Sequence, residues 1–341
     1  MTTILPGRSW NASLLGAVLV LALRWQPAVA DDAIKIGVVK NSVYGPFFVA
    51  ESRGYFTDEK LAAELVYFDS TLTMGPAVAS GSIDFAGGNA SAAIYNLGAH
   101  GAVRVIAGFA EDAPGFQLFA FVASNRAYQA GLKSFAALPG HSVAIQTRGG
   151  AAGYTLNLIE AKYHLDPSSV RELSLQSNSN MISAVTGGTA DSFIGPATPI
   201  MPVVKRGGAK LIGFTGDEVQ WQLGTIYTAK KTADERHDVV ARFLAAYRKG
   251  VHDYDDAFVD AGGTRRDSAD APAILEILSK HLGQTPAALK PALGYVNAEG
   301  RLDVTDIRRQ IAWYKSQGMI KPDADAQATI DQRYVLSLPE K

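Results

Sequence analysis

Short apolar runs rich in β-branched residues alternate with amphipathic stretches along most of this chain. Continuous runs of this kind are typical of strands buried on both faces of a parallel sheet. The predicted strands cover residues 34–39, 64–68, 84–86, 119–123, 142–145, 172–175, 191–194, 211–214 and 224–228. The predicted helices cover residues 46–54, 73–79, 154–163, 181–186, 233–256, 271–282 and 304–316. This alternation predicts an α/β fold with mainly parallel sheets flanked by helices.

An internal repeat divides the pattern into two similar halves. Residues 77–84 recur as residues 184–191, at an offset of 107, and eight of twenty-four positions are identical between 68–91 and 175–198. A shared turn between two unrelated strand–helix–strand units would explain the shortest match. The gapless offset instead favours a duplication. Either explanation predicts two α/β lobes, whose strand-end loops would face one cleft.

The crossing strands place the boundaries of the lobes. Lobe one is predicted to comprise residues 31–123 and 225–341, and lobe two residues 124–224. Lobe one is therefore expected to be built from both ends of the chain that follows residue 30.

The first thirty residues have the pattern of a secretory signal peptide. Arg8 precedes an apolar run over residues 12–23, and Ala28, Val29 and Ala30 form a small-x-small cleavage site. The alternative is an uncleaved membrane anchor, although the run is short for a bilayer span. We expect cleavage after Ala30 and a periplasmic protein.

Composition and charge exclude several classes of function. Removing residues 1–30 takes away Arg8 and Arg24 and no acids, which leaves 30 basic and 33 acidic residues. No basic stripe is present to bind nucleic acid or anionic lipid. Cysteine is absent, so an exported chain must rely on an apolar core, and 47% of its residues are hydrophobic.

Three segments resemble periplasmic solute-binding proteins of the nitrate/sulfonate/taurine ABC-transporter type. Residues 50–56 resemble the family's Ala-x-x-x-Gly-Tyr-Phe element, residues 80–85 its Gly-x-x-Asp-Phe element, and residues 131–140 the run before a strand of lobe two. The resemblance implies a type II, two-lobed (Venus-flytrap) fold and a monomer without a cofactor. It also implies a small-molecule ligand and two partners, the permease transmembrane subunits and their ATPase.

One departure from this family affects the expected ligand. Gly150 stands where many members have a serine, and Gly153 where they have a histidine. The resemblance therefore does not imply a nitrate or taurine ligand for this chain.

The segment Thr147, Arg148, Gly149 and Gly150 is the first candidate for ligand binding. It follows a strand and precedes a helix, where backbone N–H groups and the helix dipole favour an anion. The Arg148 guanidinium matches carboxylate or sulfonate oxygens. The alternative is that Arg148 pairs with a surface acid and the glycines only form a turn.

Further candidates lie at the other strand ends, and we expect about half of them to contact ligand. They are Tyr44, Ser70, Thr71, Asn89, Ser91, Gln117, Ser177, Thr198 and Trp221. Aromatic and amide groups beside one anion clamp favour an organic anion, either a sulfonate or an aromatic or aliphatic carboxylate.

Signals of catalysis are missing from the sequence. The six histidines have no partner at metal-ligand spacing, and there is no nucleophile elbow or phosphate-binding loop. Asp84 and Asp191 occupy equivalent repeat positions, which favours turns at strand starts over a catalytic pair. We therefore expect a binding protein and no enzyme. A periplasmic sensor for a membrane receptor remains an alternative, as does an enzyme similar to thiamine-pyrimidine synthases, which carry a cysteine-rich motif.

Overall fold

Two five-stranded sheets organise the computed structural model, which describes residues 1–3, 31–260 and 263–338. The first sheet has the strand order β2-β1-β3-β12-β4. Its strands are β1 (Asp32–Val39), β2 (Leu61–Phe68), β3 (Phe85–Asn89), β4 (Val103–Gly108) and β12 (Gly224–Ala229). Strands β2 and β3 run parallel to β1, and β12 runs antiparallel to both of its neighbours.

The second sheet repeats this arrangement with the order β10-β6-β9-β7-β8. Its strands are β6 (Phe119–Ala123), β7 (Ser142–Ile145), β8 (Arg171–Ser174), β9 (Ser192–Pro196) and β10 (Lys210–Phe214). Strands β8 and β9 are parallel to β7, whereas β6 is antiparallel to β9 and β10. The α/β prediction is confirmed, and each sheet is mixed because one crossing strand enters it in the opposite direction.

The offset of 107 found in the sequence preserves strand register. Ile36 pairs with Phe85 in the first sheet, and the equivalent Val143 pairs with Ser192 in the second. The bounds of β3 and β9 also differ by 107 residues. The repeat is therefore a repeat of structure as well as of sequence.

The repeated aspartates hold the starts of the strands. The backbone N–H of Lys35 donates to Asp84 Oδ2 at 2.8 Å, and that of Ser142 donates to Asp191 Oδ2 at 2.9 Å. The prediction that these carboxylates belong to turns is confirmed.

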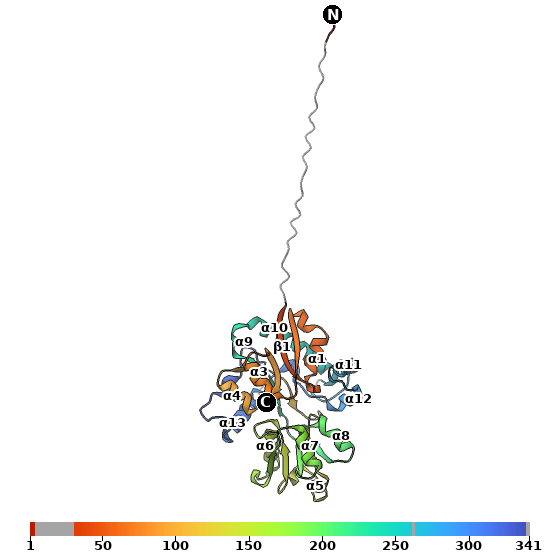
Figure 1. Cartoon of the computed structure of the whole chain (residues 1–341), viewed down its shortest axis with the longest axis vertical. Coiled ribbons are helices and arrows are strands. Elements are labelled where there is room, and N and C mark those ends of the chain that lie inside the picture. Colours follow the sequence, from red (N-terminus) through yellow and green to blue (C-terminus); the bar gives the residue numbers. More distant parts are fainter. Residues whose placement is uncertain (4–30, 261–262, 339–341) are drawn as a thin grey trace. The chain divides into compact units, whose positions relative to one another are not determined.

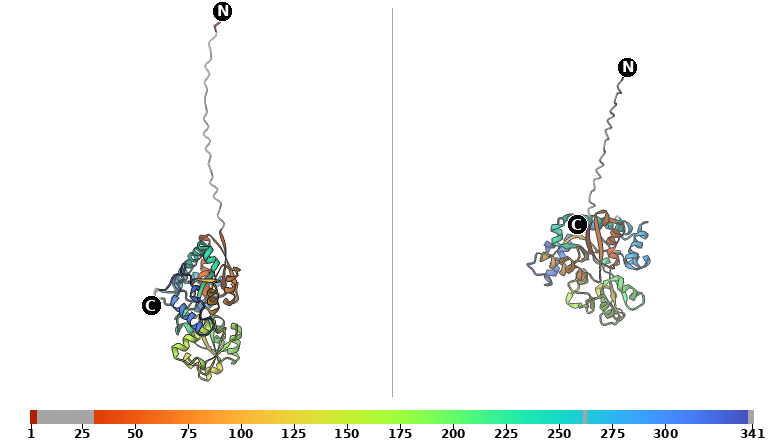
Figure 2. Two further views of the ribbon diagram at one scale, coloured as in Figure 1. Left: turned by 90° about the vertical axis from the view of Figure 1, so that its left-hand side faces the viewer. Right: turned by 45° about the horizontal axis from the view of Figure 1, so that its top comes forward.

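Helices pack around each sheet, as Figures 1 and 2 show. Around the first sheet and beside its lobe lie α1 (Gly45–Ser52), α2 (Tyr55–Asp58), α3 (Met74–Ala79), α4 (Ala92–Ala99), α9 (Lys230–Glu235), α10 (His237–Phe258), α11 (Ala271–Leu282), α12 (Pro286–Leu289) and α13 (Val304–Ser316). Around the second sheet lie α5 (Asn125–Gln129), α6 (Ala151–Tyr163), α7 (Asn178–Thr186) and α8 (Ala197–Lys205). We call the first sheet with its helices lobe one and the second sheet with its helices lobe two.

Three differences separate the predicted elements from the observed ones. Strand β6 was predicted to belong to lobe one, but it pairs with β9 and β10, so the predicted boundary after residue 123 is wrong at this strand. The chain crosses to lobe two before β6, because β6 fills the position that β12 fills in the first sheet. The predicted helix 233–256 is divided at Arg236 into α9 and α10, and β4, α4, α5 and α8 were not predicted.

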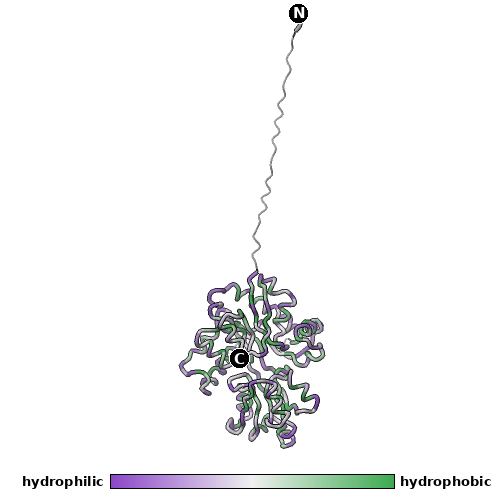
Figure 3. Tube along the Cα trace, in the orientation of Figure 1, coloured by the Kyte–Doolittle hydropathy of each residue, from purple (hydrophilic) through white to green (hydrophobic). Residues whose placement is uncertain are grey.

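Aromatic packing fills the interior of each lobe, and Figure 3 shows apolar stretches of the chain within the folded part. In lobe one, Phe85 stacks on Phe243 of α10 with ring centroids 3.8 Å apart. In lobe two, Phe121 packs on Phe135 at 4.7 Å. These rings bury large apolar areas, which a chain without disulfides needs for its stability.

The predicted signal peptide lies almost entirely outside the described residues. Residues 31–341 form one compact unit by themselves. Among the helices that the structure describes, none combines the length and the apolar character needed to cross a bilayer.

Candidate functional site

Helices of both lobes begin at the carboxyl ends of parallel strands. In lobe one α1, α3 and α4 follow β1, β2 and β3, and in lobe two α6, α7 and α8 follow β7, β8 and β9. Ser91 accepts from the N–H of Ile94 at 3.4 Å and so caps α4, whereas α6 begins at Gly150 without a side-chain cap in the described structure. The helix N-termini give this edge of each sheet a positive potential without a charged side chain.

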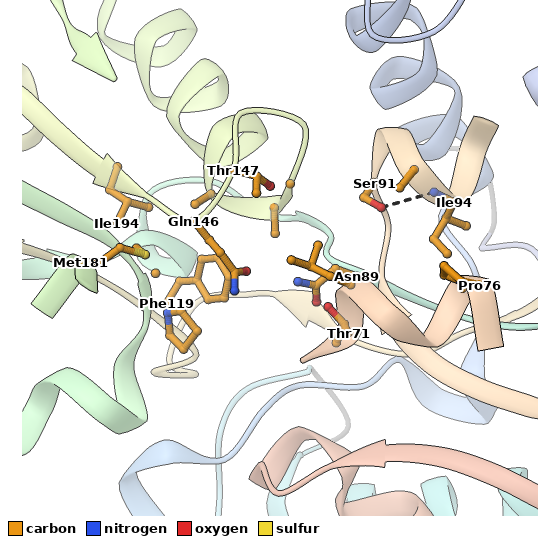
Figure 4. A pocket seen from close by; sticks show the side chains of 18 of the residues that line it. Thr71, Pro76, Asn89, Ser91, Ile94, Phe119, Gln146, Thr147, Met181 and Ile194 are labelled. Atoms are coloured by element: carbon orange, nitrogen blue, oxygen red, sulfur yellow. Dashed lines mark hydrogen bonds between the residues drawn. The ribbon is translucent and has the colours of Figure 1, made fainter. Parts of the chain in front are cut away.

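A cleft between the lobes is lined by these helix starts and strand ends. It has an inner compartment and a larger outer compartment. The residues that line both compartments form what we call the neck: Thr71, Asn89, Phe119, Gln146 and Pro196. Figure 4 shows the inner compartment with the neck residues Thr71, Asn89, Phe119 and Gln146 directed into it.

The inner compartment is mainly apolar. Its further lining residues are Leu72, Gly75, Pro76, Ser91, Ala93, Ile94, Leu97, Thr147, Gly150, Ala151, Ala152, Met181, Ile194 and Gly195. None of these side chains carries a formal charge, so the compartment suits an uncharged, apolar part of a ligand.

The outer compartment contains more polar groups. Its further lining residues are Val39, Lys40, Asn41, Val43, Tyr44, Asp69, Ser70, Phe109, Leu118, Asn178, Thr198, Pro199 and Leu223. Lys40 and Asp69 are the only charged residues among the described residues that line either compartment. Both side chains are exposed, so these charges lie where solvent reaches the cleft.

The polar side chains of the cleft fall into two groups. Asn41, Ser70 and Ser91 accept hydrogen bonds from the backbone N–H groups of Val43, Leu72 and Ile94 and therefore act as helix caps. A second group has no hydrogen-bond partner for its side chains among the described residues. This group is Thr71, Asn89, Gln146, Thr147, Asn178 and Thr198. Unpartnered polar groups in a cleft are available to a ligand.

Eight of the thirteen residues predicted to bind ligand line the cleft. They are Tyr44, Ser70, Thr71, Asn89, Ser91, Thr147, Gly150 and Thr198. Tyr44 presents its ring only, because its hydroxyl donates to the carbonyl of Gly87 at 2.7 Å. Burial raises the pKa of Tyr44, so the hydroxyl stays protonated and serves as this donor.

Arg148 lines neither compartment, so the structure does not place it where the predicted anion clamp would require it. Its Nε lies 2.9 Å from Glu172 Oε2 on β8, and its side chain is 62% exposed. Glu160 lies nearby on α6, where burial and the Glu172 carboxylate raise its pKa to about 7 while Arg148 opposes this. Arg148 therefore neutralises acids of lobe two, which was the alternative left open by the sequence.

Two of the glycines after Arg148 occupy positions where a side chain would clash. A Cβ atom at Gly153 would lie 2.1 Å from the carbonyl oxygen of Arg148, and one at Gly150 would lie 2.7 Å from Thr147 Oγ1. Gly149, which does not line the cleft, accepts a hydrogen bond through its carbonyl from the N–H of Ala92 at 3.2 Å. This bond joins the start of α4 to lobe two beside the inner compartment.

Ser177 and Gln117 were also predicted to bind ligand, and both lie outside the cleft. Ser177 caps α7 by accepting from the N–H of Asn180 at 3.1 Å. Gln117 lines a separate, open surface hollow with Arg265 and Lys290. Neither residue had a sequence signal that separated a cap or a surface position from a cleft position.

Trp221, the last of the five, is buried in the connection between the lobes. It lies in β11 (Trp221–Gln222), which pairs with β5 (Glu111–Asp112) to form the two-stranded hinge. Its ring meets Tyr154 of α6 edge-on, with centroids 5.0 Å apart. Trp221 therefore packs the hinge and lines neither compartment of the cleft.

Sequence reasoning missed several residues that line the cleft. Gln146 and Phe119 belong to the neck, and Asn178 lines the outer compartment. Two of these positions carried a usable signal, because Gln146 immediately precedes Thr147 and Asn178 is the repeat equivalent of Thr71. Phe119 had none, because a residue in a crossing strand looks like any other core position.

Within the described residues, no three His, Asp or Glu side chains come together as metal ligands. The buried carboxyls of Glu111 and Asp112 belong to the hinge and lie outside both compartments of the cleft. The cleft is thus arranged to hold a molecule by shape, helix dipoles and neutral hydrogen-bonding groups.

Comparisons with solved structures place this architecture among periplasmic binding proteins. The chain is similar to the periplasmic aliphatic sulphonate binding protein SsuA from Escherichia coli, with 18% identity, a TM-score of 0.68, and coverage of 91% of this chain and 94% of that one. It is similar to SsuA from Xanthomonas axonopodis pv. citri bound to MOPS, with 18% identity, a TM-score of 0.66, and coverage of 89% and 99%. For the periplasmic nitrate-binding protein NrtA from Synechocystis the identity is 14%, the TM-score 0.64, and the coverage 87% and 84%.

At these identities the structural comparisons show the two-lobed periplasmic binding protein fold. No curated protein sequence matches the chain significantly. The family model described as NMT1/THI5 like matches residues 41–256, which is more than half of the chain and includes both copies of the repeat. The chain therefore belongs to the NMT1/THI5 like family.

Proposed function

We propose that this protein is the solute-binding component of an ABC importer and that it closes around a small organic anion. The observation that carries the proposal is the cleft, to which both lobes contribute unpartnered polar side chains beside an apolar compartment. A ligand that contacts both lobes favours the closed arrangement by its differential contacts.

The chemistry of the lining supports an organic ligand over a small inorganic ion. Ile94, Leu97, Met181 and Ile194 offer the inner compartment only apolar surface. An ion such as nitrate would leave this surface in contact with water, whereas a hydrocarbon group would bury it at a gain of about 25 cal/mol per Å².

An anionic head group fits the outer compartment. The N-termini of α7 and α8 reach it through Asn178 and Thr198, and Lys40 lies at its edge. Helix N-termini and neutral donors can hold a sulfonate or a carboxylate without a buried arginine. This replaces Arg148 as the basis for expecting an anion.

The wider assignment follows from the same proposal. The mature protein, cleaved after Ala30, would act as a monomer in the periplasm and pass its solute to permease transmembrane subunits driven by their ATPase. The solute-binding proteins SsuA and NrtA, which share the fold, support this assignment.

A thermal-shift and calorimetry screen of the mature protein tests the proposal. The panel contains alkanesulfonates, MOPS, aliphatic and aromatic carboxylates, and nitrate. A true solute at about 100 times its Kd should stabilise the protein by about 2.7 kcal/mol, or raise Tm by about 5 °C. Nitrate alone binding, or no organic anion binding at millimolar concentration, would contradict the proposal.

A pair of matched variants shows whether binding occurs in the cleft. Thr71→Trp fills the neck and should abolish binding of any organic anion found in the screen. Thr57→Trp, on the exposed surface of α2, should leave binding unchanged. Equal binding by both variants would place the ligand elsewhere.

A further inference from the structure

Two carboxamide side chains meet at the neck of the cleft, one from each lobe. Asn89 is the last residue of β3 in lobe one, and Gln146 follows β7 in lobe two. Both line the inner and the outer compartment. Figure 4 shows the two side chains directed into the same space from opposite sides, with Phe119 and Thr71 beside them. A ligand that extends from one compartment to the other would therefore lie beside both side chains.

Neither carboxamide has a hydrogen-bond partner for its side chain in the part of the chain that the structure describes. Amides in the hinge are bonded instead: Gln222 Nε2 donates to the carbonyls of Ala110 at 3.0 Å and Gly224 at 2.8 Å. Gln310 likewise donates through its amide to the carbonyl of Gln222. The neck amides thus keep their full hydrogen-bonding capacity for another molecule.

A carboxamide offers both an N–H donor and a carbonyl acceptor. A purely apolar chain between Asn89 and Gln146 would leave these groups unmatched once the cleft closes, which is costly for buried polar groups. A sulfonate at the neck would accept from both NH₂ groups and leave both carbonyl oxygens facing its own oxygens. The neck is matched by a neutral group that both donates and accepts.

We propose that Asn89 and Gln146 select solutes with an amide-like group between an apolar tail and an anionic head. This inference rests on the proposed function and names the substrate class of the same cleft: acylamino alkanesulfonates or carboxylates. The tail lies in the inner compartment against Ile94 and Met181, and the head lies in the outer compartment near Asn178 and Thr198. Because each lobe supplies one amide, the ligand's central group bridges the lobes only when they close.

Two probes of matched length test this assignment. Hexane-1-sulfonate has six chain atoms before sulfur, and 2-(propanoylamino)ethanesulfonate has the same chain with an amide at its centre. Calorimetry on the mature protein should give at least about tenfold tighter binding of the amide probe. The reason is that its amide forms hydrogen bonds with the Asn89 and Gln146 carboxamides, which the hydrocarbon chain leaves unpaired. The Asn89→Leu and Gln146→Met variants should each reduce this preference to less than about threefold.

Two controls separate selection from general damage. Gln117→Met changes an amide outside the cleft and should keep the full preference. Gln146→Glu retains the size of the side chain but replaces the NH₂ donor by a carboxylate. This variant should also lose the preference, and it replaces Gln146→Met if that variant is too unstable to measure.

The outcomes distinguish this inference from the proposed function. Equal binding of the two probes by the wild type, or a preference that survives in both neck variants, overturns the inference but leaves an anion-binding protein. Binding of neither probe overturns the inference too, and the wider panel of organic anions then decides the function independently.

Discussion

The two lobes use equivalent positions of the repeat in two different ways. Away from the cleft, equivalent positions make equivalent contacts. Asp84 accepts from the N–H of Lys35 and Asp191 from that of Ser142, which is the repeat equivalent of Lys35. At the cleft the equivalents differ: Asn89 corresponds to Pro196, and Val39 to Gln146. We call the sheets with their strand-start contacts the frame, and the residues of each lobe that line the cleft its walls. The frame is the same in the two lobes whereas the walls differ, so that one ligand meets two different surfaces.

The hinge shows the same division. Strand β5 follows β4, and β11 follows β10, so the two crossings lie at equivalent places in the repeat. Glu111 in β5 is buried, and its repeat equivalent Glu218 lies in the partly exposed segment before β11. Equivalent glutamates thus experience opposite environments, which makes their titration a test of the comparison.

The largest expected effect concerns Glu111. Burial raises the pKa of Glu111 to about 7, against donors from Gln220 and Asn297 that favour its charged form. The folded state then holds a proton that the unfolded state has lost, so stability falls as pH rises from about 5 to 7. Over this range the Glu111 carboxyl should lower the free energy of unfolding by at most about 3 kcal/mol, and Glu111→Gln should remove this decrease. Urea unfolding at several pH values measures it. A variant with the wild-type pH profile would show that Glu111 ionises normally.

A smaller effect is expected at the strand-start aspartates. Both aspartates accept from the equivalent backbone N–H and from an arginine, which is Arg236 at 3.0 Å for Asp84 and Arg126 at 2.9 Å for Asp191. Asp191 alone also accepts from a hydroxyl, that of Ser142, at 2.9 Å. Asp191→Ala should cost about 2 to 3 kcal/mol, and Asp84→Ala about 1 kcal/mol less, since each bond to a charged group contributes roughly 1.5 to 3 kcal/mol.

Ser142→Ala supplies the matched control for this pair. It removes the hydroxyl and should bring the cost of losing Asp191 close to that of losing Asp84. Ligand affinity should stay unchanged in all three variants, because none of these residues lines the cleft. A loss of affinity without a loss of stability would mean that the frame and the walls are not separate.

The sequence predicted the frame better than the walls. Periodicity and the repeat identified nearly every strand of both sheets, because a buried strand needs a continuous apolar run whatever surrounds it. Eight candidate residues at strand ends do line the cleft, because topology alone brings those ends together. Arg148 and Gln146 show what the sequence cannot predict. The Arg148 side chain points to Glu172 and the Gln146 side chain lines the cleft, although both residues follow the same strand.

Glu218 should show the opposite pH dependence to Glu111 and a smaller effect. Its burial is outweighed by hydrogen bonds from Lys162 at 2.5 Å and Tyr163 at 2.7 Å, which hold the pKa of Glu218 below its ordinary value. Its contribution is present above the unfolded pKa and disappears as pH falls through the folded pKa. Glu218→Gln should therefore cost about 1 kcal/mol at pH 7 and less near pH 3, by the same urea measurements. A loss that grows on acidification would reverse the sign assigned here.

The smallest effect is expected at Arg148, whose repeat equivalent Asn41 lines the outer compartment while Arg148 does not. Because the Arg148 side chain is largely exposed and pairs with Glu172, Arg148→Ala should cost less than about 1 kcal/mol of stability. The affinity of the Arg148→Ala variant for an organic anion found in the screen should change less than about twofold. Asn41→Ala, at the equivalent position inside the cleft, should weaken binding about fivefold. A tenfold loss in Arg148→Ala would mean that the guanidinium leaves Glu172 to meet the ligand, and the two walls would then be more alike than their sequences are.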